Sequence, residues 1–355
     1  MLYIDRYADS HLHAYAPFEE TFSMLDRLAE MNVTDAALMA YTYIETGIDN
    51  NLVCLYVKEK YRRIALRTFG GLYYDPALNN KIMPFKEQAE LLLAMGCDGI
   101  KFLDMKPNYN LYCGCLMDDP AYDAMYDMLE ARGVPLTAHV ADPDDFWHKE
   151  LMLPFEVERG WCYEDPKFLT MQQIFDALLR RLEKNPNLKL CLAHFGFLSR
   201  RLEMCYEICE KYPNVRFDLA PAANIFADFA QRLPEWREFF VRYSDRIMYG
   251  TDTSTGNGAE YMASLQQTML RAISAPCSEA FPVPHSPEKT MRGFDLDAES
   301  QKNIGRESFF KFVGREIRPL DRALVREHAR LIESIARKRG DEAVLRTTAR
   351  VLSEL

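Results

Sequence analysis

The sequence predicts an α/β protein of the (β/α)8 TIM-barrel class, and three observations lead to this prediction. Short apolar runs of strand length recur eight times along the chain, and longer stretches of helical period lie between them. This alternation is typical of repeated βα units around a parallel sheet. At 355 residues and 48% hydrophobic composition, the chain has enough material to bury the core of one such barrel.

The predicted strands are apolar, β-branched or aromatic runs that end in polar residues. They lie within residues 6–13, 35–42, 64–75, 96–104, 134–141, 188–196, 215–221 and 247–254. Segments with apolar residues at helical spacing include 18–31, 84–96, 120–133 and 199–213, and Gly, Asn or Pro lies near the end of each. Eight units favour a closed barrel over an open sheet.

Two connections are longer than a barrel needs, and we expect them to be loop insertions after strands five and eight. The first contains residues 142–168, and the second includes residues 274–295. Loops that leave the C-terminal ends of barrel strands surround the catalytic face, so both are expected to cover it. The charged helical stretch 326–355 predicts a C-terminal extension. We therefore assign the barrel to residues 1–318 and the extension, packed on the barrel or at a subunit contact, to residues 319–355.

Composition narrows the range of partners. The net charge is -10 and no basic block is present, which argues against a nucleic acid or an anionic membrane and favours a small-molecule substrate. The N-terminus has no leader pattern, and no apolar segment approaches membrane-spanning length, so we expect a cytoplasmic protein. The nine cysteines are expected to be reduced. The sequence is compatible with a homo-oligomer and does not distinguish it from a monomer.

Five polar side chains fall at the ends of predicted strands. His11 and His13 are one residue apart at the end of the first strand, so their imidazoles can converge on one point. Two histidines do not complete a catalytic zinc site, which usually has three protein ligands and one open position. His139, His194 and Asp252 end strands five, six and eight. Because the strand ends of a barrel meet at one face, the sequence predicts that these five side chains lie together.

These motifs resemble the amidohydrolase superfamily, and more closely its amidohydrolase-related branch of metal-dependent TIM-barrel hydrolases and decarboxylases. The resemblance rests on "DSHLH", "GIKFL", "TAHV", "LAHFG" and "YGTDT" in this order, with "QKNIGRESFFKFVG" also similar, and it covers about residues 5–313. It implies a site that binds one divalent metal through His11, His13, His139 and Asp252, with His194 beside them as the catalytic histidine.

Simpler interpretations exist for some of these residues. His139 and His194 can each be a hydrogen-bonded core histidine, and Asp252 can cap the following helix. The resemblance favours the metal site for Asp252. Lys101 has three interpretations: an ammonium that pairs with a substrate carboxylate, a carboxylated lysine that bridges two metals as in binuclear relatives, or a structural ion pair. We favour the first.

Several loop residues are candidates for substrate binding. They are Tyr15, His148, Arg200 and Asn224, with Trp147 and Trp161 as further residues of the pocket. Arg200 and its neighbour Arg201 can bind an anion through bidentate hydrogen bonds, or they can begin a solvated helix. His148 is also a candidate acid or base. An aromatic residue in a loop more often packs than contacts a substrate.

Imidazole and carboxylate ligands suit Zn²⁺, Mn²⁺ or Fe²⁺, and zinc is the favoured metal. The predicted activity is hydrolysis of an amide, lactone or ester bond of a small anionic substrate by metal-activated water. Asp252 is expected to move the proton, and His194 to orient the water or stabilise the oxyanion. The alternative is non-oxidative decarboxylation of a small carboxylic acid with the same metal. A third interpretation is a barrel that binds a ligand without turnover.

Overall fold

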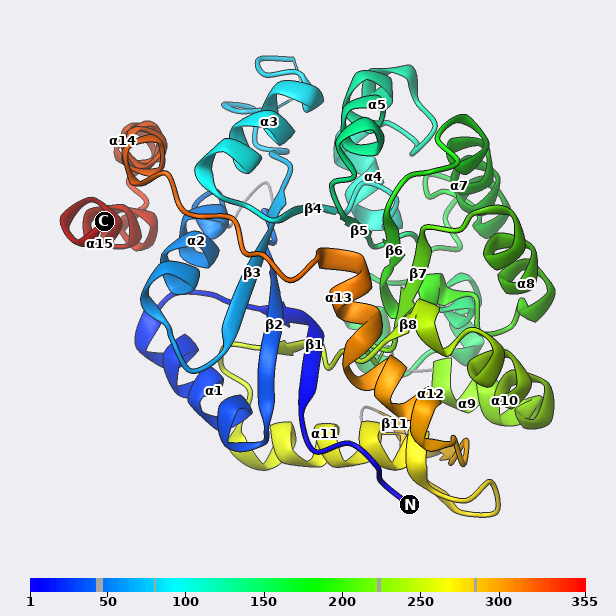
Figure 1. Cartoon of the computed structure of the whole chain (residues 1–355). Coiled ribbons are helices and arrows are strands. Elements are labelled where there is room, and N and C mark those ends of the chain that lie inside the picture. The colour runs from blue at the N-terminus through cyan, green and yellow to red at the C-terminus, as the bar shows by residue number, and fades with distance from the viewer. Residues whose placement is uncertain (43–46, 80, 222–224, 284–285) are drawn as a thin grey trace.

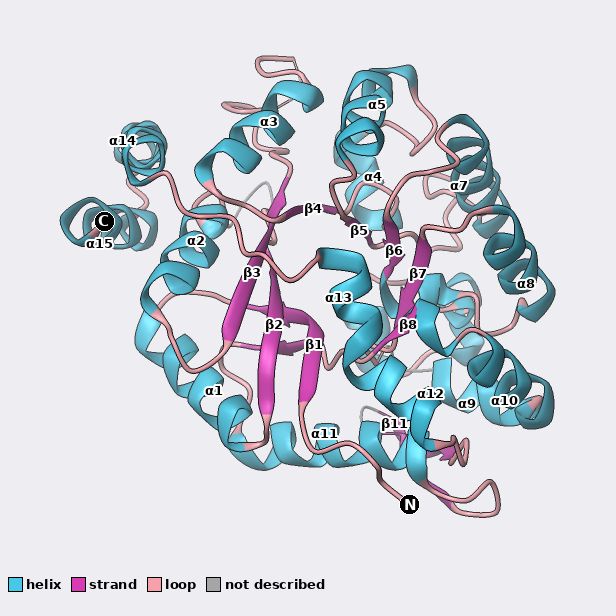
Figure 2. Cartoon of the chain, viewed as in Figure 1, coloured by secondary structure: helices cyan, strands magenta, loops and turns pink. Residues whose placement is uncertain are grey.

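The computed structural model describes residues 1–42, 47–79, 81–221, 225–283 and 286–355. In these residues, parallel strands curl around a central axis and helices cover their outer side, which confirms the predicted TIM barrel (Figures 1 and 2). The barrel strands are β1 (Tyr7–His13), β2 (Val33–Met39), β3 (Ala65–Gly71), β4 (Gly99–Phe102), β5 (Leu136–Ala138), β6 (Leu190–Leu192), β7 (Val215–Asp218), β8 (Ile247–Met248) and β9 (Thr253–Ser254). Each of the eight predicted runs overlaps a strand.

The barrel closes between its first and last strands. The predicted eighth strand is broken at residues 249–252 into β8, which pairs with β7, and β9, which pairs with β1. Across the break, the backbone N–H of Ser10 donates to the carbonyl oxygen of Tyr249 at 2.9 Å. A Cβ atom at Gly250 would lie 2.9 Å from Oγ of Ser10, so this close approach requires glycine.

Helices follow the strands in the order that the sequence predicts. They are α1 (Phe18–Glu30), α2 (Asn50–Lys60), α3 (Phe85–Met95), α4 (Pro107–Cys113), α5 (Asp123–Arg132), α7 (Met171–Lys184), α8 (Leu202–Lys211), α9 (Ile225–Gln231), α10 (Leu233–Arg242) and α11 (Ala259–Ser274). Helix α7 illustrates how the sequence sets a helix start. Its N-cap Thr170 accepts from the backbone N–H of Gln173 at 3.3 Å, and Oε1 of Gln173 accepts from the backbone N–H of Thr170 at 2.9 Å. This capping box satisfies two groups that would otherwise lack partners.

The interior of the barrel is filled by an apolar layer. Ala37, Phe69, Cys191 and Met248 pack together there with phenylalanines from the segment that contains α12 (Ala298–Lys302) and α13 (Ser308–Val313). The rings of Phe69 and Phe312 stack with centroids 6.1 Å apart. Helix α13 lies across the end of the barrel that faces the viewer in Figure 1. The other end, where the strands finish, is therefore left for the polar side chains.

The two insertions differ in structure. The insertion after β5 contains short helical turns and α6 (Pro154–Glu158). The segment expected as a loop after strand eight is instead the helix α11 followed by an antiparallel hairpin of β10 (Ala280–Val283) and β11 (Ser286–Arg292). The Nζ atom of Lys289 on this hairpin lies 3.1 Å from Oδ2 of Asp145 in the first insertion. The two insertions therefore contact each other.

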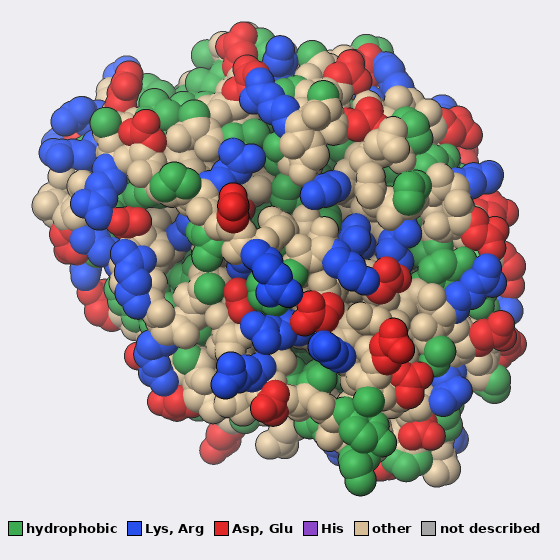
Figure 3. All heavy atoms as spheres, in the orientation of Figure 1, with side chains coloured by type: hydrophobic (Ala, Val, Ile, Leu, Met, Phe, Trp, Pro, Cys, Tyr) green, Lys and Arg blue, Asp and Glu red, His purple; other side chains and the backbone are tan. Residues whose placement is uncertain are grey.

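Two helices form the end of the chain, α14 (Arg322–Arg339) and α15 (Glu342–Glu354), as the sequence predicts. They pack against each other and against α3 and α2. The hydroxyl of Tyr73 lies 2.6 Å from Nε2 of His328, and both side chains are buried. Basic and acidic side chains are intermixed on the face of the molecule shown in Figure 3. In the described residues, no helix is both long and apolar enough to cross a membrane.

Candidate metal centre and active site

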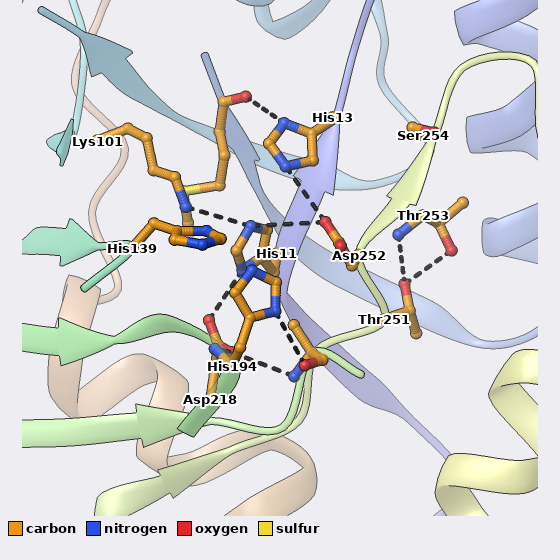
Figure 4. A network of polar contacts seen from close by, with 12 residues as sticks. His11, His13, Lys101, His139, His194, Asp218, Thr251, Asp252, Thr253 and Ser254 are labelled. Carbon is orange, nitrogen blue, oxygen red and sulfur yellow. Dashed lines mark hydrogen bonds and ion pairs between the residues drawn. The ribbon is translucent and has the colours of Figure 1, made fainter. Parts of the chain in front are cut away.

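Three potential ligands converge where β1 and the broken eighth strand end (Figure 4). His11 and His13 project from the same face of β1, with ring centroids 5.1 Å apart. Oδ1 of Asp252 lies 3.2 Å from Nε2 of His13 and 3.7 Å from Nε2 of His11. One ligand atom from each of the three residues lies within 4.8 Å of the others. This spacing allows the three atoms to bind one ion.

The opposite nitrogen of each imidazole is held by an acceptor. Nδ1 of His13 lies 2.9 Å from the carbonyl oxygen of Met39, and Nδ1 of His11 lies 2.9 Å from Oδ2 of Asp218. A carbonyl oxygen only accepts, so His13 carries its proton on Nδ1 and leaves the lone pair of Nε2 facing Asp252. Metal-binding histidines commonly have such a partner, because it fixes the tautomer and the ring orientation. The donor set therefore fits a divalent metal.

The His194 imidazole lies beside this group, 5.0 Å from the ring of His11 between centroids. Its Nδ1 lies 3.1 Å from the carbonyl oxygen of Ala220, which fixes the same tautomer. The backbone of residues 194–197 is left-handed, with φ of 54° at His194. Non-glycine residues seldom adopt this conformation, which costs on the order of 1 kcal/mol or more per residue. The buried Asp218 carboxylate supports the turn by accepting the backbone N–H of His194 at 2.7 Å.

His139 ends β5 next to His194, with ring centroids 4.8 Å apart. Its side chain does not join the converging group of His11, His13 and Asp252. Instead, Nε2 of His139 lies 3.0 Å from Oδ1 of Asp142, which also pairs with Lys106 at 2.5 Å. The structure thus places His139 beside His194 and in contact with Asp142, and its role as a fourth ligand stays a prediction.

Lys101 reaches the site from β4, where its side chain is 1% exposed. Its Nζ atom lies 3.3 Å from Nε2 of His11 (Figure 4). Burial lowers the pKa of the Lys101 ammonium to about 8. The side chain of Lys101 therefore lies directly beside the candidate metal ligands. From this position it could pair with a substrate carboxylate as an ammonium, or bind metal as a carboxylated lysine.

The charges at the site suit cation binding near neutral pH. Burial, together with the charge of Lys101, lowers the pKa of His11 well below its usual value, and burial lowers the pKa of His194 to about 4. Burial acts to raise the pKa of Asp252, but its contact with His13 and the nearby imidazoles outweigh burial and lower it. The imidazoles of His11 and His194 are therefore neutral and the Asp252 carboxylate is ionised, which is the state that metal binding requires.

A cavity of about 540 Å³ opens above these residues. Its floor contains His11, His13, Lys101 and Asp252, and half of its aromatic lining residues come from the insertion after β5. The aromatic lining residues are Tyr41, Phe146, Phe155, Trp161, Phe197 and Tyr261. A cavity of this size suits a small-molecule ligand.

The substrate-binding candidates behave differently from one another. Tyr15 stacks on His13 with centroids 6.2 Å apart but does not line the cavity, and His148 is exposed outside it. The guanidinium of Arg200 donates to Asp145 at 2.8 Å and to Asp228 at 2.9 Å, so it joins loops and does not face the cavity. Asn224 lies outside the described residues. Of the two tryptophans, Trp161 lines the cavity and Trp147 does not.

Sequence reasoning missed Asp218, Asp142 and Lys106. A signal for Asp218 was present, because this residue ends the predicted seventh strand and carboxylates at that edge of a barrel face the site. Asp142 follows His139 by three residues, but nothing local indicates that its carboxylate contacts Lys106. That contact depends on the meeting of two loops.

The chain matches the family model for amidohydrolases over residues 8–307 and belongs to this family. Membership implies metal-dependent chemistry of the hydrolase or decarboxylase type. No curated protein matches the chain.

Solved structures of remote similarity include three bacterial proteins. An uncharacterised TIM-barrel protein from Bordetella bronchiseptica is 12% identical, with 75% of this chain and 95% of that chain covered and a TM-score of 0.47. A candidate amidohydrolase from Staphylococcus aureus is 12% identical, with 87% of this chain and 99% of that chain covered and a TM-score of 0.49. An amidohydrolase from Mycoplasma synoviae is 10% identical, with 93% of this chain and 94% of that chain covered and a TM-score of 0.45.

Proposed function

We propose that the protein is a metal-dependent hydrolase that cleaves an amide, lactone or ester bond of a small anionic substrate. The observation that carries this proposal is the convergence of His11, His13 and Asp252 at the floor of a cavity, with the Nδ1 atoms of both histidines held by acceptors. Zinc is the favoured metal, and Mn²⁺ or Fe²⁺ also suits these ligand types. A divalent metal held there supplies Lewis acidity and makes water a nucleophile near neutral pH.

Three residues of the chain then transfer the proton, orient the water and bind the anionic group of the substrate. The ionised Asp252 carboxylate has a second oxygen that accepts a proton from the attacking water and returns it to the leaving group. Nε2 of His194 has its lone pair toward the site, because Nδ1 donates to Ala220, so it orients water through a hydrogen bond. The Lys101 ammonium, buried beside His11, pairs with an anionic group of the substrate.

Decarboxylation is the second candidate function. The position of Lys101 beside the ligand atoms supports it, since an ammonium there also pairs with a carboxylate placed at the reacting centre. The two reactions differ in product, because hydrolysis consumes water and releases an acid, whereas decarboxylation releases carbon dioxide.

The test is a turnover screen of the purified protein, loaded in turn with Zn²⁺, Mn²⁺ and Fe²⁺, against amides, lactones, esters and carboxylic acids. Acid release and carbon dioxide release are measured on the same samples. We expect acid release that is lost in His13→Ala and kept in His148→Ala, a control at an exposed histidine outside the cavity. Carbon dioxide release alone would support the second function, and bound metal without either product would favour a binding protein.

A further inference from the structure

The mouth of the cavity carries a group of residues that the proposed reaction does not use. Phe155, Arg159 and Trp161 all line the cavity and all come from α6 and the turn that follows it. Phe155 is 41% exposed, and Arg159 is also exposed. We call these three residues the mouth cluster.

A defined turn places the mouth cluster. The backbone N–H of Trp161 donates to the carbonyl oxygen of Glu156 at 3.1 Å, and that of Gly160 donates to Val157 at 3.0 Å. This pair of bonds is the Schellman arrangement, in which the residue after the helix end is left-handed. Gly160 has a φ of 72°, which glycine adopts without strain. The turn therefore folds Trp161 back toward the end of α6, where Arg159 is the C-cap residue.

Two cations flank the indole of Trp161. The guanidinium carbon of Arg159 lies 5.2 Å from the ring centroid, and Nζ of Lys106 lies 5.8 Å from it. Arg159 also lies 5.8 Å from the ring of Phe155. Behind the indole, Phe146 stacks on it with centroids 5.7 Å apart and is itself 4% exposed. The aromatic wall is thus anchored in the protein, and positive charge lies on it.

Three acidic residues line the cavity, and Asp252 lies at its floor, while the other two already have partners. Asp142 pairs with Lys106, and one oxygen of Glu156 accepts the backbone N–H of Leu153 at 2.8 Å. In the part of the chain that the structure describes, Arg159 forms no ion pair with a carboxylate, and its contacts are the aromatic rings. The mouth cluster therefore offers an uncompensated guanidinium beside two flat apolar surfaces.

We propose that Phe155, Arg159 and Trp161 form a subsite that binds the anionic group of a planar, unsaturated molecule at the cavity mouth. The guanidinium supplies two parallel N–H donors to a carboxylate, and the rings stack on the flat part of the molecule. If the proposed function holds, the subsite selects substrates that carry a second anionic group, far from the one that Lys101 binds at the floor. This last step rests on the proposed function, whereas binding at the mouth does not.

The experiment measures dissociation constants by calorimetry for three probes: benzoate, its neutral analogue benzamide, and the non-planar cyclohexanecarboxylate. The variants are Arg159→Gln, which removes the charge, and Trp161→Leu, which removes the indole. Arg132→Gln is the matched control, because Arg132 is an exposed arginine of α5 that pairs with Glu90 and does not line the cavity. His13→Ala tests whether the floor is involved.

We expect the wild-type protein to bind benzoate about tenfold more tightly than benzamide, the lower range for a hydrogen bond to a charged group. This preference should disappear in Arg159→Gln and persist in Arg132→Gln. Trp161→Leu should remove the preference for benzoate over cyclohexanecarboxylate.

The proposal is overturned if the wild-type protein shows no preference for benzoate, or if Arg159→Gln retains it. It is also overturned if His13→Ala loses the preference while Arg159→Gln keeps it, because the anion then binds at the floor. A preference that survives in His13→Ala, in a protein without turnover of any substrate, would support the mouth subsite although the proposed function had failed.

Discussion

The Asp218 carboxylate accepts a hydrogen bond from His11, with Oδ2 lying 2.9 Å from Nδ1. Its other oxygen, Oδ1, accepts the backbone N–H of His194 at 2.7 Å. One buried side chain at the end of β7 thus orients a residue of β1 and the left-handed turn after β6. Asp218 therefore connects the candidate ligands to the candidate catalytic histidine.

Asp218→Asn should weaken metal retention by roughly 10- to 100-fold, the effect of losing such a partner. The substituted amide can donate a hydrogen bond to an unprotonated Nδ1 of His11, which would place the ring proton on Nε2 and block the lone pair that faces the site. Metal affinity is measured by competition with a chelator. Asp245→Asn is the control, since Asp245 makes an exposed ion pair with Lys311. Equal affinity in both variants would show that the contact is only structural.

The purified protein should carry about one divalent transition metal per chain. His11→Ala, His139→Ala and Asp252→Asn should each lose the metal and keep the fold, because each removes one of the predicted donor atoms. Elemental analysis measures the metal and circular dichroism checks the fold. If His139→Ala alone retains the metal at the wild-type level, His139 stays with Asp142 and the site has three protein ligands.

An anomalous difference map at the metal edge should contain one peak near His11 and Lys101. We expect one because Lys101 is proposed to act as a free ammonium. Two peaks about 3.5 to 4 Å apart with Lys101 between them would establish a two-metal site with a carboxylated lysine.

His194→Asn separates metal binding from catalysis. The barrel and the carbonyl oxygen of Ala220 hold the His194 ring, and His194 is not one of the predicted metal ligands. Replacing the imidazole should therefore leave most of the metal in place. Turnover should fall roughly 10²-fold or more, the scale of a lost acid–base group. Metal content and turnover are measured on the same preparation. Loss of metal as complete as in His139→Ala would make His194 a ligand, and full activity would make it a core histidine.

His328 in α14 should make stability depend on pH. Burial lowers its pKa to about 4 from 6.5, so the unfolded chain binds a proton below about pH 6.5 that the folded protein does not. This difference in proton binding therefore lowers the free energy of unfolding progressively as the pH falls from about 6.5 to 4, by on the order of 3 kcal/mol in total. His328→Gln should reduce the slope of unfolding free energy against pH in that window. The control variant His148→Gln, at an exposed histidine, should leave the slope unchanged. An unchanged slope in His328→Gln would refute the prediction.

The sequence alone was sufficient to predict the barrel and the strand ends that carry the polar residues. Strand and helix periods are local properties, so the eight runs and the positions of His11, His13, His194 and Asp252 could be read without knowing any long-range contact. The insertion after strand eight was predicted from its length, but the hairpin inside it was not, because the short strands β10 and β11 are interrupted by prolines and give no alternating pattern.

Tertiary structure decided where the loop side chains point. Arg200 resembled an anion-binding residue in the sequence, but its guanidinium pairs with Asp145 and Asp228, which lie 55 and 28 residues away. The same holds for Lys106, which meets Asp142 only because the loops after β4 and β5 are neighbours in the barrel. The direction of a long side chain depends on charges brought close by folding, and no local pattern records them.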